Sequence, residues 1–215
     1  MSGTDATTGQ SLTQSSSVTD ARVRVGPVSR NSEELRSRLQ EAALELYLER
    51  GYDKTTTGDI AARAGVTERT FFRHFADKRE VFFDGEAQLR ELLTEAVAAV
   101  PAGTKPLPTL RAAFHQAVPL IEHNLPVTER RYPVIAATPA LQERALAKSA
   151  ALAGAVADAL RARGVADQLA ALCAQVGMDT YAIAIRRWGA DRTEDLHAHL
   201  DRAFTDLRLA ANALK

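Results

Sequence analysis

The sequence of 215 residues contains one cysteine, Cys173, and no long hydrophobic run. A single cysteine cannot form a disulfide within the chain, and this usage favours a reducing compartment. No apolar stretch approaches the roughly 18 residues that a membrane-spanning helix needs, and the N-terminal residues lack the basic and apolar regions of a signal peptide. We therefore predict a cytoplasmic protein that is neither exported nor embedded in a membrane.

The sequence also has no excess of charge, because 27 basic side chains balance 27 acidic ones. A neutral chain has no overall field that attracts a nucleic acid or a membrane surface, so such a partner would have to be met by a local group of charges. Hydrophobic residues make up 46% of the chain. This content is enough for the core of one large domain or of two smaller ones.

Signatures of catalysis and of metal binding are missing as well. The sequence has no glycine-rich phosphate loop and no nucleophile elbow. His197 and Asp201 lie four residues apart on a predicted helix, but His199 would point elsewhere and no cysteine or glutamate cluster completes a site. We predict no catalytic residues, no metal and no cofactor, and hence a protein that is not an enzyme.

What the sequence does contain is helical periodicity without strand alternation. Residues 1–30 are predicted to be a disordered tail that ends in a basic arm with Arg22, Arg24 and Arg30. From residue 31 onward we predict an all-α fold of about nine helices. The first four follow caps at Asn31 or Ser32, Thr57, Thr67 and Asp77, and the others cover about 109–125, 128–137, 139–164, 166–187 and 192–213, with kinks or breaks expected at Pro119 and Pro133.

One short stretch, TERTFFRHFADKRE at residues 67–80, places three phenylalanines among charged side chains. Phe71 and Phe75 are four residues apart and share one helix face, with Phe72 on its edge. So short a helix is not stable alone in water, so this face is predicted to be buried against a scaffold. The polar residues of the stretch would then project from the opposite side.

The preceding residues complete a helix-turn-helix. Ile60, Ala61 and Ala64 provide a small apolar face, and Gly65 permits a tight turn. This arrangement can place the N-terminal side chains of the second helix in a DNA major groove. Over residues 22–79, twelve basic side chains against nine acidic ones provide a weak local positive field.

The stretch TTTGDIAARAGVTERTFFRHFADKREVF, at residues 55–82, resembles the DNA-binding signature of TetR-family transcriptional regulators. The resemblance implies a three-helix DNA-binding domain at residues 31–78 and a helical domain at 79–215 that binds a small-molecule effector and dimerises. It further implies a homodimer, joined through the last two helices, that binds double-stranded palindromic operator DNA. Such a protein is most often a repressor, and its effector releases it from DNA or modulates its binding.

Carried over to this sequence, the resemblance implies phosphate contacts from Thr57 and Lys78. Arg69 or Arg73 would read guanine, and Glu68 would either accept from cytosine or orient one of these arginines. The basic arm either enters the minor groove or remains disordered. The full set of predicted DNA-binding residues is Thr57, Thr67, Glu68, Arg69, Thr70, Phe72, Arg73, His74 and Lys78, in which Phe72 departs from the tyrosine that many members have.

The larger domain is predicted to hold the effector and the dimer interface. Helix 166–187 has two apolar stripes, which need two partners, so either one stripe meets a second copy of the chain or both serve the internal core. The predicted effector pocket is lined by Phe114, His115, Val118, His123, Tyr132, Met178 and Tyr181. An alternative is a small-molecule or protein-binding module that retains the helix-turn-helix only as a scaffold.

Overall fold

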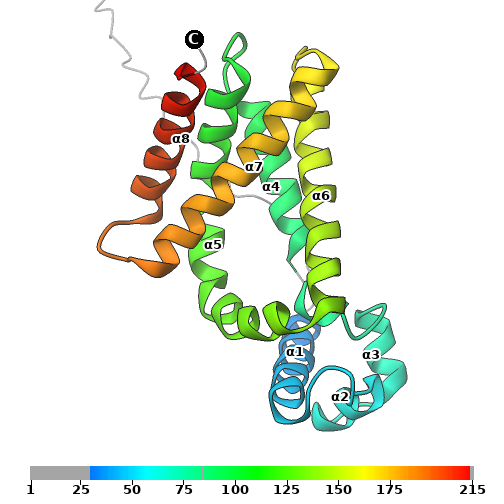
Figure 1. Cartoon of the computed structure of the whole chain (residues 1–215). Helices are drawn as coiled ribbons and strands as arrows, with labels where there is room; N and C mark the ends of the chain where they lie inside the picture. Colours follow the sequence, from blue (N-terminus) through cyan, green and yellow to red (C-terminus); the bar gives the residue numbers. More distant parts are fainter. Residues whose placement is uncertain (1–29, 84, 214–215) are drawn as a thin grey trace, which may run out of the picture.

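The computed structural model describes residues 30–83 and 85–213, so most of the predicted tail and basic arm lies outside the described residues. Within these ranges the chain forms eight α-helices, one short 3-10 helix and no strand, which confirms the all-α prediction. The elements are α1 (Arg30–Arg50), α2 (Thr57–Arg63), α3 (Glu68–His74), η1 (Glu80–Phe82), α4 (Glu86–Ala99), α5 (Pro106–Ala137), α6 (Pro139–Ala162), α7 (Asp167–Ala190) and α8 (Leu196–Asn212). Figure 1 shows α4 to α8 as a tall bundle with α1, α2 and α3 gathered at one end.

The small helices begin at polar caps. The predicted cap of α2 at Thr57 is wrong by one residue, because Thr56 accepts a hydrogen bond from the Asp59 backbone and Asp59 accepts one from the Thr56 backbone. This reciprocal pair is a capping box, which satisfies two amides that the first turn leaves unpaired. The predicted cap of α3 at Thr67 is confirmed by its bond from the Thr70 amide.

The predicted helix that opens at Asp77 is also wrong, because α4 begins only at Glu86. Asp77 instead accepts hydrogen bonds from the backbone amides at positions 79 and 80, in the turn that leads into the short helix η1. This turn directs Val81 and Phe82 inward, where both are buried and the Phe82 ring lies 5.2 Å from the ring of Tyr47. The burial of these two side chains outweighs the local tendency to continue as one helix.

The helices predicted at 109–125 and 128–137 are one helix, α5, which explains why eight helices are found rather than nine. Pro119, Pro126 and Pro133 lie inside it. Each proline removes a backbone donor and crowds the preceding turn, which bends a helix without ending it when the surroundings hold both halves. Figure 1 shows the resulting change of direction, by which the last turns of α5 reach the end of the bundle that carries α1.

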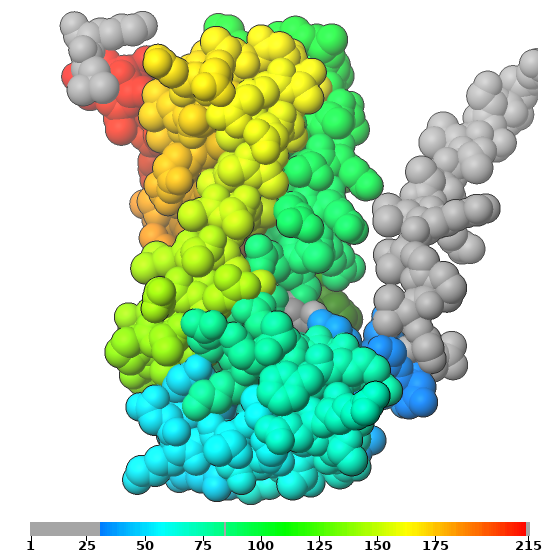
Figure 2. Space-filling model, turned by 90° about the vertical axis from the view of Figure 1, so that its right-hand side faces the viewer, coloured from blue at the N-terminus to red at the C-terminus, as the bar shows by residue number. Residues whose placement is uncertain are grey.

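Two clusters of buried apolar side chains hold the fold together. The larger one lies inside the bundle of α4 to α8, and the smaller one joins α1, α2, α3 and η1. Val134 of α5 and Leu141 of α6 belong to the smaller cluster, so the α5–α6 corner packs against the helix-turn-helix end. Figure 2 shows this end directly beneath α4 and α6. In the part of the chain that the structure describes, no helix has the length and apolar character needed to cross a bilayer.

Candidate nucleic-acid interface

The helix α3 is fixed by two buried rings rather than three. Phe71 has no exposed surface and Phe75 is buried, whereas Phe72 is 51% exposed. The prediction that all three rings form one buried face is therefore wrong for Phe72. Successive helical residues differ by about 100° in direction, so an edge position turns outward when only one side of the helix is covered.

The polar residues at the start of α3 point to solvent. Thr67, Glu68, Arg69 and Arg73 are exposed, and Thr70 is half-buried. The hydroxyls of Thr67 and Thr70 lie 3.0 Å apart. Neither arginine forms an ion pair within the described residues, so two unneutralised guanidiniums stand on one short helix of the helix-turn-helix end.

Lys78 has a structural role in this arrangement. Its amine donates to the backbone carbonyls of Tyr52 and Thr55, both at 2.9 Å, and lies 4.0 Å from the centre of the Tyr52 ring. The Tyr47 hydroxyl donates in turn to the Lys78 carbonyl at 2.7 Å. Lys78 thus ties the loop between α1 and α2 to the segment after α3, and a phosphate contact would compete with these bonds.

Two arginines of α1 also contact the helix-turn-helix motif. The Arg36 guanidinium donates to the His74 carbonyl at 3.4 Å and stacks over the ring of Phe75 at 4.9 Å. Arg38 donates to the Ala64 carbonyl at the tight turn, where Gly65 has a positive φ of 70°. His74 was predicted to contact the DNA backbone. In the structure this residue is half-buried, and its carbonyl accepts the hydrogen bond from Arg36 of α1.

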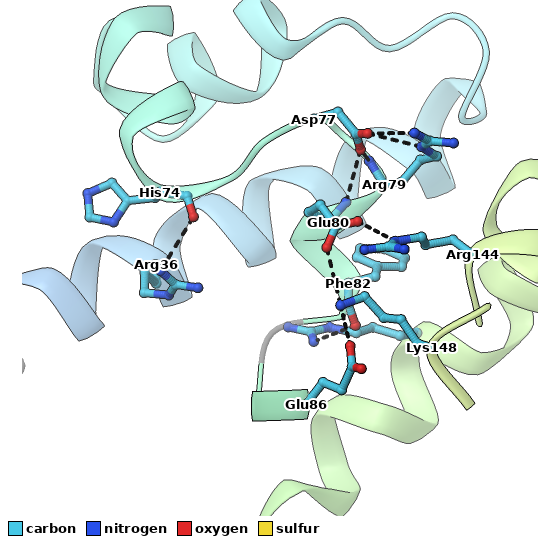
Figure 3. A network of polar contacts seen from close by, with 10 residues as sticks. Arg36, His74, Asp77, Arg79, Glu80, Phe82, Glu86, Arg144 and Lys148 are labelled. Carbon is cyan, nitrogen blue, oxygen red and sulfur yellow. Dashed lines mark hydrogen bonds and ion pairs between the residues drawn. The ribbon is translucent and has the colours of Figure 1, made fainter. Parts of the chain in front are cut away.

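An ion-pair network joins the helix-turn-helix end to the bundle (Figure 3). Glu80 of η1 accepts from Arg144 of α6, and Lys148 of α6 lies 3.3 Å from Glu80 and also donates to Glu86 at the start of α4. Partial burial acts to raise the pKa of Glu80, but hydrogen bonds from Arg144 and Lys148 hold it below its usual value. Sequence reasoning missed this network, because its partners lie more than sixty residues apart and share no motif.

The residues predicted to line an effector pocket separate into two groups. Phe114, Val118, Met178 and Tyr181 are brought together in the bundle core, with the rings of Phe114 and Tyr181 stacked at 4.6 Å. His123 and Tyr132 are exposed instead. Two cavities of about 650 and 440 Å³ lie elsewhere, each lined by residues of both the helix-turn-helix end and the bundle.

The predicted histidine His115 lies on α5, half-buried, and its ring contacts side chains of α8. Its Nε2 is 2.8 Å from the Asp201 carboxylate, and its Nδ1 is 2.7 Å from Nδ1 of His197. Arg111 also donates to Asp201. This cluster links two helices by polar contacts, and among the described residues no group of three or more histidine, cysteine or acidic side chains is arranged to hold a metal.

Comparison with known proteins agrees with this architecture. The family model described as "Bacterial regulatory proteins, tetR family" matches residues 39–84, and the model "MftR C-terminal domain" matches residues 104–211, half of the chain. The HTH-type transcriptional regulator TcmR of Streptomyces glaucescens is 43% identical over 79 residues, which cover 37% of this chain and 35% of TcmR. The HTH-type transcriptional activator FasR of Mycolicibacterium smegmatis is 31% identical over 93 residues, or 43% of this chain and 42% of FasR.

The chain thus spans less than half of the length of these curated relatives. Among solved structures, Thermus thermophilus FadR, a TetR-family transcriptional repressor in complex with lauroyl-CoA, is 30% identical and aligns over 81% of this chain and 92% of FadR, with a TM-score of 0.46. The two family models cover both the helix-turn-helix and the bundle. The chain therefore belongs to the TetR family of transcriptional regulators.

Proposed function

We propose that this chain is an effector-responsive transcriptional repressor that binds a palindromic operator as a homodimer. The observation that carries the proposal is the placement of α3, which is held from one side by Phe71 and Phe75 and presents Arg69 and Arg73 on the other. A short helix anchored in this way can enter a major groove while its neighbours lie on the phosphate backbone. The division into a DNA-binding part at 31–78 and an effector part at 79–215 belongs to the same proposal.

The exposed apolar surface supports dimerisation through α7. Leu169, Leu172 and Ile183 are exposed on this helix, and Leu209 is exposed on α8. The other predicted stripe of α7 and the apolar face of α8 lie in the core of the chain itself, as the burial of Trp188, Leu200 and Phe204 illustrates. The proposed interface therefore rests mainly on the exposed residues Leu169, Leu172 and Ile183, the outer stripe of α7, which would meet its own copy around a two-fold axis.

The proposed effector site lies in the bundle core around Tyr181. Burial raises the pKa of the Tyr181 hydroxyl, and this oxygen has no hydrogen-bond partner among the described residues. Native proteins pair nearly all buried polar groups, so an unpaired one indicates a place where a ligand or water binds. We infer an effector with an apolar body, which would part the rings of Phe114 and Tyr181, and with a hydrogen-bond acceptor for the hydroxyl.

The ion-pair network around Lys148 would transmit effector binding in the bundle to the helix-turn-helix. A ligand that enters the core would displace α4, whose first residue Glu86 is tied through Lys148 to Glu80 beside the helix-turn-helix. The protein would then exist in a DNA-binding form and a released form. Shifting the ratio of these forms from 99:1 to 1:99 requires that the effector bind the released form more tightly by about 5.5 kcal/mol, which a ligand buried in that form only can supply.

Replacing Arg73 by alanine is expected to weaken specific operator binding by about 1–3 kcal/mol if this side chain reads a base. The measurement is fluorescence anisotropy with duplexes selected from the DNA that flanks the gene, over a range of salt concentrations. Lys105→Ala, at the N-cap of α5, removes a positive charge outside α3, α7 and α8 and should leave binding unchanged. Absence of any salt-sensitive, sequence-specific complex for the unmodified protein would refute the regulator and favour a binding module.

Replacing Tyr181 by phenylalanine is expected to raise the free energy of unfolding by about 1 kcal/mol, because it removes a buried hydroxyl without a partner. Tyr47→Phe is the matched control, since it removes a hydroxyl that donates to the Lys78 carbonyl, and it should lower the free energy of unfolding by about the same amount. Denaturant titration followed by circular dichroism measures both changes. A loss of stability in Tyr181→Phe would count against an unfilled hydrogen-bonding site.

A further inference from the structure

Glu68 and Thr57 meet at the shared N-terminal edge of the helix-turn-helix. Glu68 is the first residue of α3 and Thr57 the first of α2, and the Thr57 hydroxyl donates a hydrogen bond to the Glu68 carboxylate. The same carboxylate oxygen lies beside Gly58, where a Cβ atom would be 3.7 Å away. The Glu68 side chain therefore lies back over the start of α2 rather than extending from α3.

This contact differs from both roles predicted for Glu68, which were to accept from cytosine or to orient an arginine. Within the described residues the Glu68 carboxylate accepts a hydrogen bond from Thr57 and pairs with neither Arg69 nor Arg73. The two arginines thus keep their full charge, which attracts the phosphates of any DNA sequence equally. The carboxylate is the one negative side chain of α3, and it lies where the proposed phosphate contact of Thr57 would form.

We propose that Glu68 is a specificity-determining residue that acts by rejecting non-cognate DNA, an inference that rests on the proposed function. A phosphate that approaches Thr57 meets a carboxylate already bound to its hydroxyl, so like charges repel. The repulsion is relieved when Glu68 swings away from Thr57 into the groove, where a cytosine amino group offers a donor. Guanine and thymine present only acceptors there, and adenine sets the acceptor N7 beside its amino group, so cytosine suits a carboxylate best. Specificity arises from repulsion at wrong sites as well as from attraction at the right one.

The test compares Glu68→Gln with the unmodified protein. Glutamine keeps the size and can still accept from Thr57, but it removes the charge. An operator selected by the unmodified protein from a random-sequence library and a scrambled duplex of the same length and composition serve as probes in anisotropy titrations. We expect Glu68→Gln to bind the scrambled duplex at least about fivefold more tightly and the ratio of the two dissociation constants to shrink at least about tenfold.

A second arm replaces each cytosine of the selected operator in turn. For the unmodified protein, one position should cost about 5- to 150-fold in affinity, the range of one good base contact, and Glu68→Gln should lose that dependence. Glu91→Gln, an exposed charge change on α4, should match the unmodified protein on every probe. An unchanged ratio in Glu68→Gln overturns this inference alone, whereas an unmodified protein that selects no operator overturns the proposed function with it.

Discussion

Replacing Phe71 by alanine is expected to lower the free energy of unfolding of the helix-turn-helix end by about 3–5 kcal/mol, the usual loss for a fully buried phenylalanine. The ring has no exposed surface and lies 5.5 Å from the ring of Phe72 and 5.7 Å from that of Phe75. Because α3 has only seven residues, it cannot keep its helical form without this anchor. Operator binding should therefore be lost together with stability.

Phe72→Ala is the matched control, an identical substitution one residue away on a half-exposed ring. It should cost less than about 1 kcal/mol, as surface changes usually do. Hydrogen exchange read separately over residues 57–75 and over the bundle would place the loss of protection of Phe71→Ala in the small cluster. Equal losses in the two variants would mean that the face assignment of α3 is wrong.

Leu172→Glu is expected to convert the proposed dimer into monomers and to abolish tight operator binding. Leu172 is 61% exposed, more than the other two residues of the outer stripe of α7. In a two-fold interface each substitution is present twice, so an interface residue worth about 2–4 kcal/mol per copy removes about 4–8 kcal/mol of association free energy. A monomer binds only one half-site of the operator. It therefore loses the affinity that is gained when two joined DNA-binding domains bind both half-sites.

Leu146→Glu on α6 is the control, since this leucine is 72% exposed but lies outside α7 and α8. Sedimentation velocity should show monomers for Leu172→Glu and dimers for Leu146→Glu, and circular dichroism should show that both remain folded. If Leu172→Glu remained dimeric, the interface would have to be sought on another face.

Much of the fold follows from local patterns. The spacing of Phe71 and Phe75, the small face of α2 and the Thr67 cap predicted the helix-turn-helix, because neighbours within one turn meet whatever the rest of the chain does. Local patterns failed where burial elsewhere was decisive. The chain turns into η1 because Phe82 is buried against Tyr47 there. Helix α5 continues through its prolines because packing holds both of its halves.

Residue types a few positions apart were enough to predict the helical class, the motif and the membership of the family. The partners of the charged side chains, in contrast, are known only from the folded chain: Lys78 donates to backbone carbonyls, Glu68 accepts from Thr57, and Lys148 bridges Glu80 and Glu86. The direction of a long polar side chain depends on partners that folding brings from distant positions. Hydrophobic periodicity predicts which face of a helix is buried, but it does not predict these distant partners.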